Sequence, residues 1–276
     1  SDAFLTQREV VSTRGRHALR VLSEGKDWTM GSLTAAAFDS WLPSFARMLP
    51  PLLAAYDALP AGDTLRAALA EQVDTLRRWN DRWDSTSVAT SLAVFWGTDI
   101  ERKLYRNAVA AHVGVETYVL ERATPGELLE SLAAASARLS ADFGSWRTPW
   151  GAINRFQRIN DSIAPSFDDA GPSIPVPFTS AQWGSLASFG ARPYPNTKKW
   201  YGSSGNSFVA VVEFGDSVRA RAVTAGGESG DPRSPHFDDQ AGRYATGQLR
   251  EVYFYPAQPR GHVERVYHPG AVSGRE

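Results

Sequence analysis

Apolar residues recur every three or four positions through the first half of the chain, a spacing typical of amphipathic helices. The clearest helix start is at Thr124, where Pro125 and Glu127 complete a capping box with proline in the first helical position. Gly144 is placed to end that helix. Further helices are predicted at 12–25, within 28–58, at 63–79, from 84 to 96, and at 100–112. Pro43, Pro50 and Pro51 predict breaks or kinks within 28–58.

The pattern changes after Gly144, where glycine and proline become more frequent. Residues 146–200 predict loops with one short helix near 152–156. Two runs rich in β-branched residues, 207–214 and 218–224, flank the turn 215–217 and predict a hairpin. A short helix at 237–245 and a strand at 251–255 are expected to follow. The pattern therefore predicts an α+β fold, with a helical region at 1–144 and a loop-rich and strand region at 145–276.

The composition of the chain excludes several kinds of partner and of active site. The 276 residues include 29 Lys+Arg and 30 Asp+Glu with no basic stripe, so no nucleic acid is expected as a partner. The longest apolar runs, 49–58 and 91–96, are shorter than the roughly 20 residues of a membrane-spanning helix. No membrane partner is therefore expected. The absence of cysteine excludes thiolate nucleophiles, disulfides and cysteine-ligated metals.

Few residues suggest self-contained chemistry. The sequence has no P-loop, dinucleotide fingerprint, HExxH motif or G-x-S-x-G elbow. His262 and His268 could bind a metal or simply lie in a solvated tail. His236, Asp238 and Asp239 are the densest titratable group, with general acid/base catalysis and loop bracing as the alternatives.

Five segments of the chain resemble motifs of one known protein family. Gly-Asn-Ser-Phe at 205–208 resembles the family's Gly-Asn/Gly-Ser-Phe, and Gly-Gly-Glu-Ser-Gly at 226–230 resembles its Gly-Gly-Gln-Ser-Gly turn. Ser-Pro-His-Phe-Asp-Asp-Gln at 234–240 is similar to Ser-Pro-His-Tyr-x-Asp-Gln. Trp-Asn-Asp-Arg at 79–82 and Trp-Arg-Thr-Pro-Trp-Gly at 146–151 resemble its Trp-Asp-Gly and Trp-x-Thr-Pro blocks. In the order and spacing of these segments the chain resembles the penicillin acylase family, whose members are N-terminal-nucleophile amidohydrolases.

The resemblance covers nearly the whole chain and has two local departures, Glu228 for glutamine and Asn80-Asp81 for Asp-Gly. It implies that the strands belong to an αββα core. It also implies that this sequence corresponds to the later part of the family's large chain, so that the nucleophilic serine and the oxyanion donors are expected on sequence upstream of Ser1. Ser1 itself is the alternative nucleophile, with its own α-amine as base.

One supporting catalytic residue is implied within this chain. The family has an arginine near its active site in a pattern like Arg-(x)5-Arg-Leu-Leu, and Arg14, followed by Arg20-Val21-Leu22, fits that spacing. Arg16 is the alternative register, and an exposed arginine at a helix start is the structural alternative. A guanidinium beside the nucleophile would keep its amine unprotonated and would brace the oxyanion asparagine.

The resemblance implies a hydrolase that cleaves the amide bond of an N-acyl substrate, such as an acyl-homoserine lactone, a lipopeptide or a penicillin, through a serine acyl-enzyme. It implies proteolytic processing, a partner in the remaining chain of the acylase, and a periplasmic location. No cofactor is required, although calcium is possible elsewhere in the complete enzyme. The alternative is a non-catalytic fragment or a binding chain. The aromatic residues that could wall an acyl pocket, with core packing as their commoner role, are Phe38, Trp41, Phe95 and Trp96.

Overall fold

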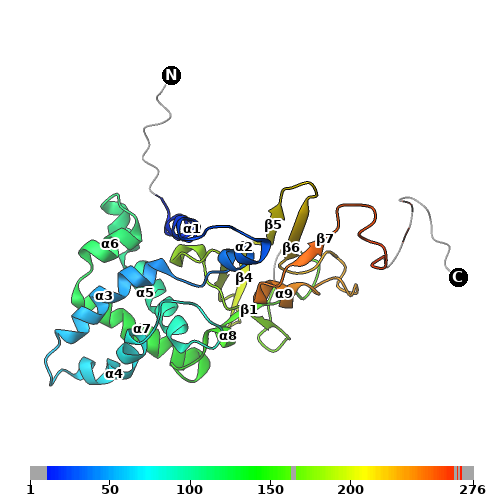
Figure 1. Ribbon diagram of the computed structural model, residues 1–276. Helices are drawn as coiled ribbons and strands as arrows, with labels where there is room; N and C mark the ends of the chain where they lie inside the picture. The colour runs from blue at the N-terminus through cyan, green and yellow to red at the C-terminus, as the bar shows by residue number, and fades with distance from the viewer. Residues whose placement is uncertain (1–10, 163–165, 264–265, 267, 269–276) are drawn as a thin grey trace.

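The computed structural model describes residues 11–162, 166–263, 266 and 268. Helices come first along the chain and two small sheets follow (Figure 1), so the predicted α+β fold is confirmed. The helices are α1 (Thr13–Glu24), α2 (Met30–Ala37), α3 (Pro43–Asp57), α4 (Thr64–Arg77), α5 (Val88–Ala110), α6 (Val115–Arg122), α7 (Pro125–Phe143), α8 (Trp150–Ile153) and α9 (Ala241–Thr246), with a 3-10 turn η1 (Ala181–Trp183).

Local helix signals predicted some boundaries and missed others. The capping box of α7 forms as expected, with both Thr124 and Glu127 in place and Gly144 in the left-handed conformation at the end. Pro43 begins α3, but Pro50 and Pro51 lie inside that helix, so the breaks predicted there are wrong. Because α3 buries one face deeply in the core, tertiary packing outweighs the two lost backbone hydrogen bonds.

The longest helix, α5, was predicted as two helices. It runs unbroken for 23 residues and is capped by Ser87 rather than by residue 84 or 85. Gly97 lies inside this helix, and Trp183 packs closely against it. A β-carbon added at Gly97 would lie 2.8 Å from the Trp183 ring. The polar interruption at 97–99 therefore marks a packing contact and not a helix end. Helix α6 was not predicted.

Two small sheets form the later part of the chain. The first has the order β2-β1-β4-β3, in which β1 and β4 pair in parallel and the other neighbours are antiparallel. The second is antiparallel in the order β5-β6-β7 and contains the predicted hairpin. The strands are β1 (Asn154–Phe156), β2 (Ile174–Pro175), β3 (Phe189–Arg192), β4 (Trp200–Gly205), β5 (Phe208–Glu213), β6 (Arg219–Thr224) and β7 (Arg250–Val252). The prediction of loops across 146–200 is therefore wrong at β1, β2 and β3, and β4 begins where that range ends.

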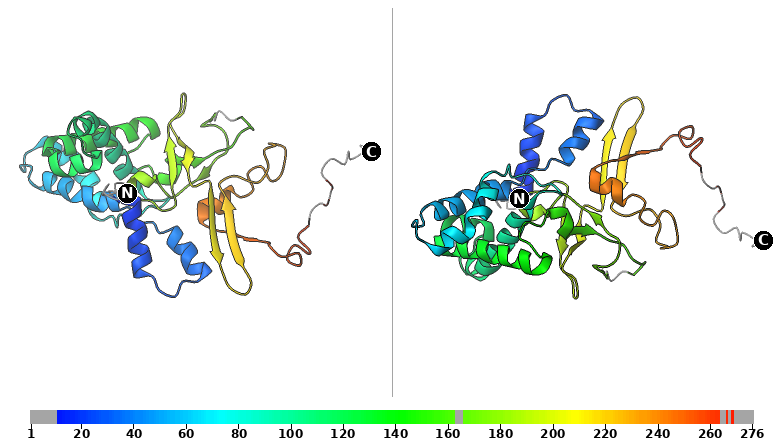
Figure 2. Two further views of the ribbon diagram at one scale, coloured as in Figure 1. Left: turned by 90° about the horizontal axis from the view of Figure 1, so that it is seen from above. Right: turned by 90° about the horizontal axis from the view of Figure 1, so that it is seen from below.

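Two apolar clusters hold these elements together. The larger fills the helical body and also takes in Trp150, Ile153, Trp183 and Trp200, so it extends past residue 144. The smaller surrounds Phe178 and lies under the β5-β6 hairpin and α9. Each large side chain that is fully buried contributes about 1.5–3 kcal/mol. Helices α1 and α2 (blue) extend from the helical body along the hairpin (yellow), where α2 contacts β5 (Figure 2).

No helix among the residues described above is both long enough and apolar enough to cross a bilayer.

The turn between the two sheets has a strict backbone requirement. Gly205 ends β4 with a backbone φ of 120°, which residues other than glycine rarely adopt. A β-carbon at this position would lie 2.2 Å from the carbonyl oxygen of Ser188. The turn brings the next residue, Asn206, against the segment that precedes β3, where its amide N–H donates to Ser188 O at 2.9 Å.

Replacing Gly205 with alanine should therefore destabilise the protein by about 2 kcal/mol or more, because the methyl group meets backbone atoms and φ is unfavourable. Chemical denaturation of the purified protein measures this loss. Gly62→Ala is the matched control, since nothing lies within 4 Å of a β-carbon there. Equal stability of the two variants would contradict the backbone requirement at Gly205.

Candidate functional site

Arg14 joins the first helix to the turn between the two sheets. Its Nη2 donates to the carbonyl oxygen of Leu186 at 2.7 Å and to Oδ1 of Asn206 at 3.2 Å. The side chain is half-buried, in contrast to the exposed arginine that was the structural alternative. The predicted site residue thus contacts the Gly-Asn-Ser-Phe motif, although 192 positions separate Arg14 from Asn206.

Asn206 is held from two directions. Besides the Arg14 contact, its Oδ1 accepts a hydrogen bond from the backbone N–H of Ser188 at 2.9 Å. The carboxamide is thereby fixed between α1 and the segment before β3. A residue with a short, planar amide side chain at this position can accept both donors.

Arg16, the alternative register, has local partners. Its guanidinium donates to the carbonyl oxygen of Val11 and to Oγ1 of Thr13, each at 2.9 Å, and the residue is exposed. Of the two arginines, Arg14 is therefore the one that contacts the strand region.

A cavity of about 330 Å³, here called the Arg14 cavity, opens beside this contact. Arg14 and Asn206 are its only polar lining side chains within the described part of the chain. Small and branched apolar residues from α1, α2, β5 and the segment before β3 line the rest: Ala18, Val21, Leu22, Leu33, Ala36, Ala37, Leu186, Ala187, Val209, Ala210 and Val211. The cavity can therefore accommodate an apolar group with a polar or anionic end near Arg14.

His17 anchors α1 one turn beyond Arg14. Its buried ring lies 2.8 Å from the carbonyl oxygen of Gly184 through Nδ1 and 2.9 Å from Oδ1 of Asp39 through Nε2. The ring is thereby held between the turn that follows η1 and the segment that follows α2. Burial alone would raise the pKa of Asp39, but hydrogen bonds from Trp41 N–H, His17 and Arg82 outweigh it and lower that pKa.

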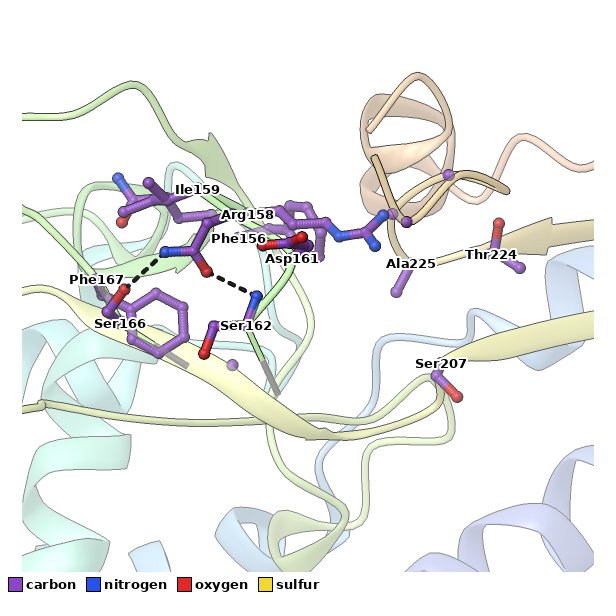
Figure 3. Close-up of a pocket in the computed structure, with 16 residues that line it drawn as sticks. Phe156, Arg158, Ile159, Asp161, Ser162, Ser166, Phe167, Ser207, Thr224 and Ala225 are labelled. Carbon is purple, nitrogen blue, oxygen red and sulfur yellow. Dashed lines mark hydrogen bonds between the residues drawn. The ribbon is translucent and has the colours of Figure 1, made fainter. Parts of the chain in front are cut away.

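A larger cavity of about 430 Å³, shown in Figure 3, lies near other motif residues. Ser207 and Thr224 lie on one side of it and Ser166 and Phe167 on the other. Its main cation, Arg158, donates to the carbonyl oxygen of Phe237 and lies 3.9 Å from the centre of that ring. The guanidinium is thus engaged in bracing the loop that follows β6.

The glycine-rich turn has a structural role. A β-carbon at Gly227 would lie 2.2 Å from the carbonyl oxygen of His236, so only glycine fits. Glu228 accepts hydrogen bonds from Gln240 Nε2 at 3.0 Å and from Arg250 Nη2 at 2.7 Å. The carboxylate that replaces the family's glutamine therefore links this turn to α9 and β7.

The other predicted candidates lie apart from Arg14. His236 pairs with Asp239 at 2.9 Å across an exposed turn, which matches loop bracing. His262 stacks on Tyr253, and no three His, Cys, Asp or Glu side chains gather as metal ligands within the described ranges. Ser1 lies outside the described residues.

The four aromatic residues named as acyl-pocket candidates do not line the Arg14 cavity. Phe95 and Trp96 are buried in the helical core, and Phe38 packs against Phe178. Trp41 lies edge-on to His17. The smaller residues that do line the cavity were not singled out, because alanine and leucine at helical spacing also predict ordinary core packing.

Glu101 on α5 is the strongest titratable outlier near this region. Burial raises its pKa to about 7, a hydrogen bond from Gln182 opposes that rise, and the nearby charge of Glu116 adds to it. Glu116 in turn pairs with Arg47 at 3.0 Å and accepts a hydrogen bond from Thr13 at 2.8 Å. Thr13 therefore links the pair Glu101 and Glu116 to the start of α1, where Arg14 is the next residue.

Comparison with known proteins gives two findings. A family model described as penicillin amidase matches residues 2–260. Among solved structures, the chain is similar to a thermostable penicillin G acylase from Alcaligenes faecalis in its orthorhombic form, with a TM-score of 0.47 and 14% identity. The alignment covers 92% of this chain and 52% of that one, so the chain spans about half the length of that structure.

The raised pKa of Glu101 predicts a pH dependence of stability. The buried carboxyl stabilises the fold fully below about pH 4.5, and this contribution is lost as pH rises through about 7. The loss should be about 3 kcal/mol. Glu101→Gln should remove it, so the difference in unfolding free energy between the variant and the wild type should widen from pH 5 to about pH 8. Denaturant titrations across this range measure it, with exposed Glu130→Gln as the control, and a constant difference would refute the assignment.

Proposed function

The chain belongs to the penicillin amidase family, whose model matches residues 2–260, and from this premise we propose that it is part of an acylase that hydrolyses N-acyl compounds. The observation that carries the proposal is the position of Arg14 at the polar end of an apolar cavity. A guanidinium beside an apolar pocket suits a substrate whose acyl chain ends in a carbonyl that becomes an oxyanion.

In the proposed reaction, a serine at a free N-terminus attacks the amide carbon of the substrate, and its own α-amine takes the hydroxyl proton. The C–N bond breaks, the amine leaves with that proton, and an acyl-serine ester remains. Water then cleaves the ester and releases the carboxylic acid. We place the serine and its oxyanion donors on sequence that is not part of this chain.

Arg14 would support the nucleophile rather than attack the substrate. Nη2 of Arg14 donates to Leu186 O and to Asn206 Oδ1, whereas Nη1 and Nε have no hydrogen-bond partner within the residues the structure describes. Those donors are available to an oxyanion asparagine or to the substrate. The positive charge would also disfavour protonation of a neighbouring α-amine, which keeps that amine competent as a base.

The apolar walls of the Arg14 cavity favour a long-chain acyl-homoserine lactone or a lipopeptide ahead of a β-lactam. We propose the remaining chain of a processed acylase as the partner and the periplasm as the location, as the family resemblance implies. The reaction needs no cofactor.

Arg14→Ala in the assembled enzyme should lower kcat at least about tenfold, because the charge and two donors next to the nucleophile are lost. Steady-state hydrolysis of an N-acyl substrate measures this, and circular dichroism checks that the fold survives. Arg16→Ala is the matched control and should keep the wild-type rate, because its contacts are local. A wild-type rate in Arg14→Ala would remove this residue from the site.

The location of the nucleophile can be tested directly. Intact mass under denaturing conditions, after treatment with a serine-directed acyl fluoride, should show a labelled second polypeptide that begins with serine. Label on Ser1 of this chain would indicate a shortened enzyme with its own nucleophile. A single unlabelled polypeptide of 30.1 kDa would support the non-catalytic alternative.

A further inference from the structure

A separate cavity of about 250 Å³ lies between the helical body and the four-stranded sheet. Its walls come from α5, α7, α8, β1, η1, β3 and β4, and three of its side chains are indoles: Trp150, Trp183 and Trp200. We call it the tryptophan cavity. It adjoins the segment that borders the Arg14 cavity, since Phe189 lines the one and Ala187 the other.

Four residues that line the tryptophan cavity have a buried polar atom without a hydrogen-bond partner among the described residues. The atoms are the indole nitrogens of Trp150 and Trp200, the hydroxyl of Thr179, and Oδ1 of Asn154. The orientation of Asn154 is fixed, because its Nδ2 donates to Val176 O at 2.7 Å and to Phe178 O at 3.0 Å. Two donors, one acceptor and one hydroxyl therefore remain to be satisfied, and a partner that supplies their hydrogen bonds stabilises the protein.

The charge on the cavity wall has one sign. Arg138 and Arg192 line it, and none of the described lining residues is Asp or Glu. The Arg192 guanidinium stacks over Tyr194 at 4.6 Å and has no ion-pair partner within the described ranges. Arg138 pairs with Asp142 at 3.4 Å, where both side chains are partly exposed. The wall therefore favours an anion.

We propose that the tryptophan cavity is a binding site for a small α-hydroxycarboxylate with an apolar side chain. The carboxylate would accept hydrogen bonds from the arginines and the indole N–H groups. The α-hydroxyl would donate to Asn154 and accept from Thr179, while Phe189 and Trp183 would cover the apolar group. Each of the four polar atoms exposes less than 1 Å², so binding includes a small adjustment of the wall side chains. This site does not depend on the proposed acylase reaction.

Isothermal titration calorimetry with 3-phenyllactate tests the proposal on the full chain, together with any polypeptide that co-purifies. Two analogues isolate the groups that matter: 3-phenylpropionate lacks the hydroxyl and 3-phenyllactamide lacks the charge. Each should bind at least about tenfold more weakly than 3-phenyllactate, because each leaves a buried polar group or an arginine unpaired.

Matched variants place the binding. Trp150→Phe and Arg192→Gln should each weaken 3-phenyllactate binding about tenfold. The controls are Trp83→Phe, which also removes a buried indole N–H without a described partner but lies outside the cavity, and exposed Arg106→Gln. Both controls should bind as the wild type does.

Three outcomes would overturn the proposal. The first is no heat of binding up to millimolar 3-phenyllactate, which would mean that the cavity holds water only. The second is equal binding of all three compounds, which would mean that neither the charge nor the hydroxyl is recognised. The third is equal weakening in the cavity variants and in their controls, which would place the compound elsewhere on the protein.

Discussion

The contact between Arg14 and Asn206 is the interaction on which the candidate site depends. Asn206 follows a glycine whose backbone conformation is closed to other residues, so the chain must turn there and must present an amide to its surroundings. That amide accepts hydrogen bonds from Arg14 and from the Ser188 N–H. Removing either partner would leave a half-buried polar group short of a hydrogen bond, so helix and turn hold each other in place.

The segment 184–188 fixes the direction of α1. Gly184 accepts a hydrogen bond from His17, and Leu186 accepts one from Arg14. Residues three apart on a helix lie on the same face, so these two bonds orient both the helix axis and its rotation. Gly184 itself has φ 93°, and an added β-carbon would lie 2.4 Å from Pro43 at the start of α3. The Arg14 side chain is therefore positioned by backbone that also packs on the helical core.

Sequence reasoning predicted the features that depend on local signals. Residues close together in the sequence determine the capping box of α7, the β5-β6 hairpin and the succession of helices. The strands β1 to β4 were missed because each has two to six residues, and β1 pairs with a strand more than forty positions away. Family spacing singled out Arg14, but its partner could not be inferred, since nothing local connects a helix start to a turn near residue 206. The cavity beside it was missed because its small apolar side chains resemble a core face, although Leu22 stays 53% exposed.

The motifs that carry the family resemblance mainly fix backbone in the described part of the chain. Gly205 and Gly227 sit where a β-carbon would meet a carbonyl oxygen, and Glu228 links a turn to α9 and β7. Such residues define a frame and supply no nucleophile. An amide hydrolase needs an activated nucleophile and hydrogen-bond donors for the oxyanion. Arg14 has two guanidinium nitrogens, Nη1 and Nε, without a hydrogen-bond partner in the described part of the chain. This arrangement supports the proposal that the reacting groups come from outside the chain and meet it at Arg14.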